Sequence, residues 1–369
     1  MSPAGAALAE LETPALLIDL DVLEANLAEM ASVASRAGVA LRPHTKTHKS
    51  PEIARMQLAA GAAGITCAKL GEAEVMAGAG LDDLLIAYPL VGEQKLRRLH
   101  GLLERARVQV SLDSVEVAEG VGRVGVARGR EVEVLVEVDT GLHRLGRPPG
   151  PPTAELAGRV ARVPGVELAG LLTHAGHSYR ATTPEELRRV AEREVLDLVE
   201  TAELCRRGGV EIRALSVGST PTARVGALVD GVTELRPGTY ALNDATMVRL
   251  GHATEATVAV RVLATVVARP TAERFVVDAG SKCLTTDQMG SAPGWMLVAG
   301  RPDLQMDFLS EEHGVGHRDQ AGADPRIGDR LQLIPGHACT CVNLFDLAYG
   351  IRGGRVEREF PIAGRGKVR

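Results

Sequence analysis

The sequence has few of the features that mark secreted, membrane-spanning or nucleic-acid-binding proteins. Five cysteines scattered over 369 residues do not form a disulfide framework. No stretch approaches the roughly 20 uninterrupted apolar residues that span a bilayer, and the first twenty residues lack the charged and apolar regions of a secretory signal. The net charge is -5 without a long basic run, so nothing indicates a nucleic-acid or membrane partner. We therefore predict a cytoplasmic protein.

Aromatic residues are scarce as well, at 2% of the chain, and give no cue to the substrate. What is present is the composition of a soluble globular protein, with 45% apolar and 24% charged residues. At this length the chain can form two domains, or one barrel with an accessory domain.

Short β-rich runs alternate with longer amphipathic stretches from about residue 13 to about residue 250. Two clear helical stretches are 22–36 and 184–207, and Thr182 or Thr183 is a suitable N-cap for the second. Eight strand–helix units in roughly 240 residues are typical of a (β/α)8 TIM barrel. A doubly wound open sheet is the competing layout. The expected strands are 15–20, 41–46, 64–69, 83–88, 108–113, 131–140, 167–174 and 214–219.

After residue 253 the pattern changes to strands joined by turns, without helical periodicity. A hairpin with Gly353 and Gly354 at its tip closes this region. We predict a barrel over 13–253 and a β-rich C-terminal domain over 254–369, to which residues 1–12 could belong. The expected strands of this domain lie within 257–270, 274–280, 329–337 and 347–366.

The first cluster of chemically active residues spans 42–49, RPHTKTHK, directly after an expected barrel strand. Active sites of this fold lie at the carboxyl ends of the strands. An amine there, such as Lys46, can form an imine with a carbonyl once neighbouring cations lower its pKa. A solvated basic loop is an equally ordinary explanation of the segment by itself.

Two later corners combine glycine with hydroxyl residues. They span 216–222, SVGSTPT, and 234–240, ELRPGTY. Backbone N–H groups and hydroxyls suit a phosphate dianion, and barrels hold phosphate after their seventh and eighth strands. A single corner of this kind is more often a plain turn. The two corners in this order indicate a phosphate site more specifically.

Two further strand ends carry ring-binding candidates. His174 ends an apolar strand where its imidazole could face a flat ring, and Tyr179 follows with a phenol able to reach a ring nitrogen. Arg144 is a plausible partner for a phenolic oxygen or a carboxylate. By itself His174 is most simply a satisfied histidine at a strand end.

These segments resemble the D-threonine aldolase and D-serine dehydratase group of fold-type III pyridoxal-phosphate (PLP) enzymes, which share the alanine racemase barrel. The resemblance covers nearly the whole chain, and RPHTKTHK with GSTPT is its most specific part. It implies that Lys46 is the Schiff-base lysine, that Tyr179 meets the pyridine nitrogen and that His174 packs near the ring. It also implies a homodimer. The implied phosphate cup consists of Gly218, Ser219, Thr220, Gly238, Thr239 and Tyr240.

The C-terminal region adds a candidate metal pair, His337 and Cys339. In an extended strand, positions i and i+2 face the same side, so one ion could contact both. Chance placement of a buried cysteine is the alternative. The resemblance implies a divalent ion here, held by a His-x-Cys pair in dehydratases and a His-x-Asp pair in typical aldolases. Cysteine favours zinc over manganese or magnesium, and His313 or Glu312 could orient water at the ion.

The resulting prediction is a PLP- and metal-dependent lyase for a small D-amino acid with a 3-hydroxyl. Cys339 narrowly favours a D-serine or D-3-hydroxyaspartate dehydratase over a D-threonine aldolase. A racemase would need a catalytic tyrosine from the C-terminal domain, where only Tyr349 occurs, and a PLP carrier would need neither the β domain nor the metal pair. The sequence assigns no role to His44, His48, Cys283 or Cys341.

Overall fold

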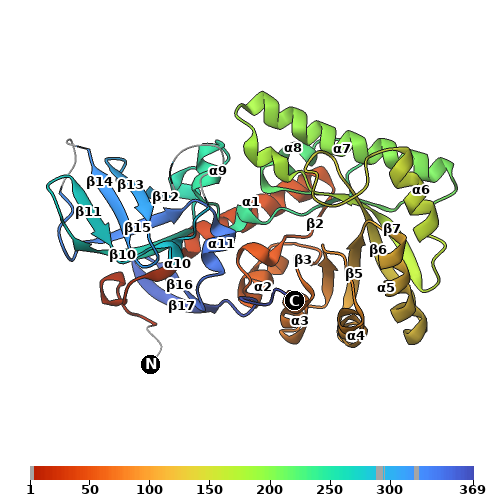
Figure 1. Cartoon of the computed structure of the whole chain (residues 1–369), viewed down its shortest axis with the longest axis horizontal. Coiled ribbons are helices and arrows are strands. Elements are labelled where there is room, and N and C mark those ends of the chain that lie inside the picture. Colours follow the sequence, from red (N-terminus) through yellow and green to blue (C-terminus); the bar gives the residue numbers. More distant parts are fainter. Residues whose placement is uncertain (1–3, 288–293, 295, 320–323) are drawn as a thin grey trace. The chain divides into compact units, whose positions relative to one another are not determined.

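The chain divides into two compact units, seen here in a computed structural model that describes residues 4–287, 294, 296–319 and 324–369 (Figure 1). The barrel unit contains Glu29–Lys46, Ala54–Gly238 and Gly366–Arg369. The β unit contains the chain up to Ala28, together with Thr47–Ile53 and Thr239–Arg365.

The barrel unit is built on eight parallel strands in the order β2-β9-β8-β7-β6-β5-β4-β3. The ring closes between its end strands, because Thr66 N–H donates to the Pro43 carbonyl at 2.8 Å and His44 and Thr66 form a parallel bridge. The TIM-barrel prediction is therefore confirmed, and the open-sheet alternative is wrong. The strands are β2 (Ala40–Leu41), β3 (Ile65–Cys67), β4 (Asp83–Ile86), β5 (Arg107–Leu112), β6 (Val132–Val138), β7 (Val166–Thr173), β8 (Ala214–Val217) and β9 (Glu234–Leu235).

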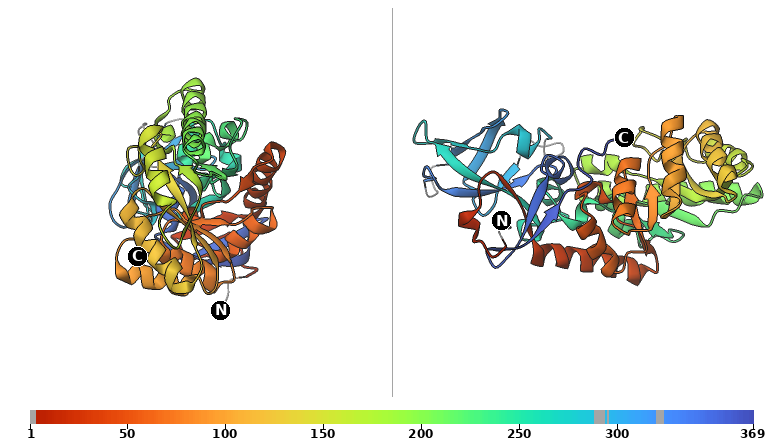
Figure 2. Two further views of the ribbon diagram at one scale, coloured as in Figure 1. Left: turned by 90° about the vertical axis from the view of Figure 1, so that its right-hand side faces the viewer. Right: turned by 90° about the horizontal axis from the view of Figure 1, so that it is seen from below.

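Helices enclose the strands of the barrel unit (Figures 1 and 2). The longest one, α7 (Pro184–Arg207), has the bounds that the sequence predicts, and its N-cap is Thr183, whose hydroxyl accepts a hydrogen bond from Glu186 N–H. None of the helices in the described part of the chain is long and apolar enough to cross a membrane. The other helices are α1 (Leu20–Ala37), which begins in the β unit, α2 (Pro51–Ala59), α3 (Leu70–Gly78), α4 (Glu93–Leu102), α5 (Val115–Arg128), α6 (Pro151–Val160) and α8 (Thr220–Gly226).

One strand that we predicted for the barrel belongs to the other sheet. The segment 15–20 forms β1 (Ala15–Asp19), which belongs to the β unit and pairs with strands far away in the sequence. The eighth barrel strand is instead β9, only two residues long, inside a segment that we predicted as a phosphate corner. The periodicity of apolar residues predicts that a segment is a strand, but it does not predict which sheet the strand joins. A strand of two residues is too short to show such a periodicity.

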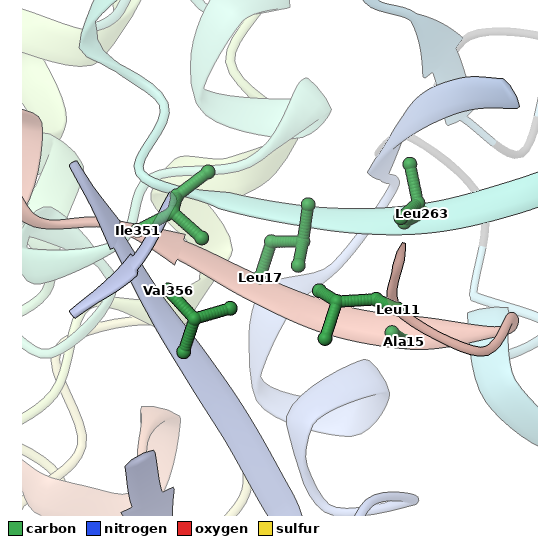
Figure 3. Packing of buried hydrophobic residues seen from close by; sticks show 6 residues of the cluster. All are labelled: Leu11, Ala15, Leu17, Leu263, Ile351 and Val356. Atoms are coloured by element: carbon green, nitrogen blue, oxygen red, sulfur yellow. The ribbon is translucent and has the colours of Figure 1, made fainter. Parts of the chain in front are cut away.

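The β unit is built on a nine-stranded, mostly antiparallel sheet. Its core includes Leu11, Leu17, Leu263 and Val356 (Figure 3). Tyr349 packs against this cluster. Gly353 and Gly354, both with positive φ, form the tip of the predicted hairpin. Besides β1, the strands are β10 (Val260–Ala268), β11 (Arg274–Val277), β12 (Met296–Val298), β13 (Leu304–Leu309), β14 (Gly314–Arg318), β15 (Arg330–Pro335), β16 (Leu347–Arg352) and β17 (Arg355–Pro361), and the short helices are α9 (Ala245–Arg249), α10 (Ser281–Leu284) and α11 (Ala338–Val342).

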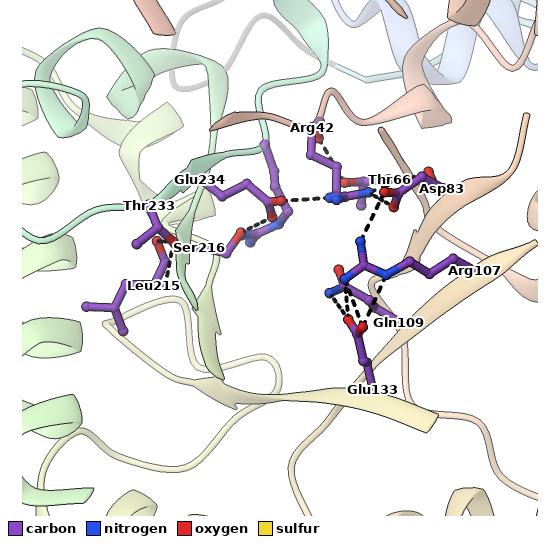
Figure 4. Close-up of polar contacts among 11 residues, drawn as sticks. Arg42, Thr66, Asp83, Arg107, Gln109, Glu133, Leu215, Ser216, Thr233 and Glu234 are labelled. Atoms are coloured by element: carbon purple, nitrogen blue, oxygen red, sulfur yellow. Dashed lines mark hydrogen bonds and ion pairs between the residues drawn. The ribbon is translucent and has the colours of Figure 1, made fainter. Parts of the chain in front are cut away.

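An ion network centred on the buried Arg42 links strands of the barrel unit (Figure 4). Arg42 pairs with Glu234 of β9 at 2.7 Å and with Asp83 of β4 at 2.5 Å, and its own side chain is 6% exposed. Asp83 also pairs with Arg107 at 3.3 Å, and Arg107 is 57% exposed. Arg42 therefore holds together two strands that are not neighbours in the sheet.

We expect Arg42→Met to lower the free energy of unfolding by about 3–5 kcal/mol, because it leaves two carboxylates without their buried cation. Arg107→Met, in the same network but exposed, is the matched control and should cost about 0–1 kcal/mol. Urea unfolding of the PLP-free protein measures both. Equal small losses in the two variants would contradict a structural role for Arg42.

Candidate active site

A cavity of about 400 Å³ opens where the barrel strands end, within the size range of cofactor sites. Its floor includes Leu172, which packs with Leu85 and Leu135 in the barrel core. Four of the residues predicted for the cofactor, Lys46, Arg144, His174 and Gly218, line the cavity. Its other lining residues are His44, Ala68, Lys69, Ala87, Tyr88, Glu137, Leu145, Leu172 and Arg236.

Lys46 lies in a single 3-10 turn, Thr45–Thr47, that follows β2. The turn is fastened to β3, because the Thr45 hydroxyl donates to the Thr66 carbonyl at 3.0 Å. Lys46 N–H in turn donates to Nδ1 of His44 at 3.3 Å. These contacts fix the backbone before and at the lysine, whose side chain lines the cavity.

Two neutral histidines stand beside Lys46. Burial lowers the pKa of His44 and of His174 well below the usual value, and the Lys46 cation lowers both further. The part of each ring that stays exposed faces the cavity rather than open solvent. Nδ1 of His174 contacts the Gly218 carbonyl at 2.5 Å, which holds the ring at the strand end. Both rings thus present uncharged, flat surfaces to a cofactor ring.

These shifts predict a loss of stability in acid. The unfolded chain binds a proton at each histidine near pH 6.5, whereas these two rings do not in the folded protein, so their effect on stability is absent well above that pH and becomes a growing loss below it. Between pH 6.5 and 5.5 each ring accounts for a loss of about 1 kcal/mol. His174→Asn should therefore reduce the loss between pH 6.5 and 5.5 by about that amount. Urea unfolding of the PLP-free protein at both pH values measures it, and an unchanged loss would contradict the assignment.

Sequence reasoning missed Glu137, a carboxylate in the cavity wall that is 5% exposed. It accepts a hydrogen bond from the Ser111 hydroxyl at 2.9 Å, and it lies 3.8 Å from the guanidinium of Arg144. Burial raises the pKa of Glu137, while Ser111 and Arg144 oppose that shift. Glu137 is therefore placed to orient Arg144, and its position on β6 facing inward was the only signal in the sequence.

Within the barrel unit, the first glycine–hydroxyl corner contacts Gly238 of the second, whereas Thr239 and Tyr240 belong to the β unit. Gly238 N–H donates to the Thr220 hydroxyl at 3.2 Å, and the Ser219 hydroxyl caps α8 by accepting from Thr222 N–H. A Cβ on Gly218 would lie 2.9 Å from Cβ of Arg236, so glycine is needed there. Ser219, Thr220 and the following Thr239 and Tyr240 are all buried.

The chemistry of this cavity fits PLP. It offers a primary amine, neutral flat neighbours, a cation in Arg144 and a glycine–hydroxyl corner that begins at Gly218. Tyr179 lies half-buried in the 3-10 turn Gly176–Arg180, after His174, and does not line the cavity. The neighbouring Ser178 hydroxyl contacts the Ser219 hydroxyl at 3.0 Å, which brings that turn against the first corner.

In the β unit, the structure corrects the geometry predicted for His337 and Cys339. β15 ends at Pro335, His337 is the N-cap of α11, and Cys339 lies in the first turn of that helix. Asp244 accepts from Ala338 N–H at 3.0 Å and so stabilises the helix start. The pair is therefore not in an extended strand, because Pro335 and the following glycine end the strand.

The two side chains nevertheless come together, since the His337 ring hydrogen-bonds Cys339. Nδ1 of His337 contacts Asp287 at 2.8 Å. Burial lowers the pKa of His337, but Cys339, Asp244 and Asp287 raise it to about 10. A carboxylate on one ring nitrogen is the usual support of a metal-binding histidine, so this pair fits a soft divalent ion.

Among the described residues, no group of three or more His, Cys, Asp or Glu side chains forms a complete metal centre. A site built on His337 and Cys339 would thus leave positions for water or substrate. His313 is exposed in the turn between β13 and β14, and Glu312 pairs with Lys282 at 2.7 Å. Within the described part of one chain, the structure does not bring His313 into a metal group with the pair.

Comparison with known proteins identifies the class to which this fold and cavity belong. Residues 18–254 match the family "Alanine racemase, N-terminal domain", and residues 259–351 match "Putative serine dehydratase domain". The chain belongs to this alanine racemase-like family of PLP-dependent enzymes.

Its relatives carry different activities. The chain is 38% identical to D-threo-3-hydroxyaspartate dehydratase of Delftia sp. (strain HT23), over 89% of this chain and 91% of that one. It is 35% identical to D-threonine aldolase of Arthrobacter sp., over 98% and 95% respectively. The crystal structure of D-threonine aldolase from Filomicrobium marinum superposes with a TM-score of 0.94 at 35% identity and covers 100% of both chains. Dehydratases and aldolases are lyases, so the prediction of a PLP-dependent lyase is confirmed at the level of class.

Proposed function

We propose that this protein is a PLP- and divalent-metal-dependent lyase of D-3-hydroxy amino acids, and that it acts as a dehydratase on D-serine or D-3-hydroxyaspartate. The main support for this proposal is the cavity that Lys46 lines together with His44, His174 and Arg144. The choice of dehydratase rests on Cys339 beside His337, because the resemblance links a His-x-Cys pair to dehydratases.

In this proposal each residue has a separate task. Lys46 would hold the cofactor covalently and would also carry the proton removed from the substrate α-carbon. Arg144, oriented by Glu137, binds the cofactor's phenolic oxygen or the substrate carboxylate. His174, held by the Gly218 carbonyl, would pack near the ring. Tyr179, which does not line the cavity, stays a prediction as the partner of the pyridine nitrogen. When bound, PLP supplies an electron sink for charge that develops at the α-carbon.

His337 and Cys339 would hold the divalent ion, with Asp287 fixing the orientation of the imidazole. The thiolate makes zinc the favoured ion, over manganese or magnesium. Such an ion supplies Lewis-acid chemistry for the 3-hydroxyl group. His313 stays a prediction as the residue that orients water.

The second candidate is a D-threonine aldolase, which would break the Cα–Cβ bond to give glycine and an aldehyde. The specific observation in its favour is the full-length structural match to the aldolase from Filomicrobium marinum. A racemase is disfavoured because Tyr349 packs against the β-unit core cluster. The predicted homodimer stays a prediction, which light scattering on the purified protein would measure.

Product analysis separates these functions. Purified protein with PLP and zinc is mixed with D-serine, D-threonine or D-threo-3-hydroxyaspartate, with and without EDTA. A 2-oxo acid and ammonia, lost with EDTA and restored by zinc, is the expected result. Glycine with an aldehyde would overturn the dehydratase in favour of the aldolase, and no product from any D-amino acid would overturn both.

A further inference from the structure

Lys69 is a cavity residue for which neither the sequence pattern nor the cofactor provides a role. It follows β3 and is the N-cap residue of α3, on the same cavity wall as Tyr88 after β4. Its ammonium lies 3.5 Å from the centroid of the Tyr88 ring, a cation–π contact that keeps the amine at the cavity.

A lysine at this position is unfavourable for the helix. N-caps are normally Ser, Thr, Asp or Asn, and a cation opposes the positive end of the helix dipole. The Lys69 side chain makes no capping hydrogen bond. In the described part of the chain, no carboxylate forms an ion pair with it either, and its ammonium lies over the Tyr88 ring instead. Folding therefore gains little from Lys69.

The cavity is lined by an excess of cations, and the anionic cofactor accounts for only part of it. Four basic side chains line it, against the single carboxylate of Glu137. Arg144 lies beside Glu137, and Arg236 already donates to the Ser216 hydroxyl and the Thr173 carbonyl, both at 2.5 Å. Lys46 is needed for the cofactor. Lys69 is the basic residue of the wall that remains for the substrate.

We propose that Lys69 binds the second carboxylate of a dicarboxylic D-3-hydroxy amino acid and selects it over monocarboxylic ones such as D-serine. Tyr88 is a positioning residue that holds the ammonium in place. The inference rests on the proposed lyase function and narrows it to one substrate class. Because Lys69 caps nothing, its replacement should leave the fold intact.

The test compares Lys69→Met, which keeps the length and removes the charge, with Lys69→Arg and with Lys95→Met. Lys95 lies on α4 outside the cavity and is the matched control for loss of a positive charge. The kcat/KM values are measured for D-threo-3-hydroxyaspartate and for D-serine. Dissociation constants of the holoenzyme for D-aspartate and D-alanine, which lack the 3-hydroxyl, provide a readout independent of turnover.

Lys69→Met should lower kcat/KM for D-3-hydroxyaspartate by about tenfold to a hundredfold and weaken D-aspartate binding to a similar extent. The values for D-serine and D-alanine should change by less than about threefold, because neither has a second carboxylate for Lys69 to bind. Lys69→Arg should retain the preference for the dicarboxylate, and Lys95→Met should match the wild type.

Equal losses for both classes of ligand would overturn the inference, because Lys69 would then bind a group that all amino acids share. No loss for either class would overturn it too. A wild-type enzyme that turns over neither hydroxy acid would contradict the proposed function, and D-aspartate binding against D-alanine binding would still decide the role of Lys69.

Discussion

Lys46→Ala is expected to reduce turnover of any D-3-hydroxy amino acid by at least about 10⁴-fold. The substitution removes the proton carrier, which alone contributes about 10²–10⁴-fold, and also the covalent link to the cofactor. The loss should appear in kcat, measured with PLP in excess. The visible absorbance of PLP bound to the protein should change at the same time, because the amine that forms the imine is gone.

The fold should survive this substitution. Lys46 lies in a turn whose backbone is held by Thr45 and His44 rather than by its own side chain. Lys95→Ala is the matched control and should keep wild-type turnover, since Lys95 lies outside the cavity. A Lys46→Ala protein that retains turnover within tenfold of the wild type would disprove the assignment.

The second large effect is expected at the metal pair. Cys339→Ala should remove bound zinc and lower kcat by about a hundredfold or more, because a Lewis-acid ion contributes several kcal/mol to such a step. Zinc content is measured by elemental analysis of the dialysed protein, next to turnover. Cys339→Asp should keep a metal but shift the preference towards manganese or magnesium, because a carboxylate is a harder ligand.

Cys341 offers a matched control for this substitution. It lies two residues further along the same helix, is buried, and contacts the Cys283 carbonyl through its sulfur at 3.1 Å. Cys341→Ala should therefore cost stability through the lost packing and keep zinc and turnover. If Cys341→Ala lost the metal while Cys339→Ala kept it, the assigned ligand would be wrong.

The barrel could be predicted from the sequence because each of its longer strands is a short apolar run followed by a helical stretch. The helix 184–207 was predicted to the residue, since Thr183, Pro184 and the two glutamates after it form a strong start signal. The strand at 15–20 was assigned to the wrong sheet. Its partners β10 and β16 lie more than two hundred residues away in the sequence, and the local sequence pattern does not predict which strands pair.

The site shows the same division between local and distant information. Lys46, His174 and Gly218 lie at strand ends where reactive or phosphate-binding residue types follow an apolar run in the sequence. All three line one cavity. Glu137 and the contact between Lys69 and Tyr88 depend on how neighbouring strands pack, so the sequence alone did not reveal them. The support of His337 by Asp287, fifty residues earlier, was hidden for the same reason.

The most direct test of the account is to identify which lysine binds the cofactor. The chain has only six lysines, so reduction of the PLP-loaded protein with borohydride, followed by proteolysis and mass spectrometry, can distinguish all of them. A single pyridoxyl group, on Lys46, is the expected result. Labelling of Lys69 or of a lysine outside the cavity, with Lys46 unmodified, would contradict it.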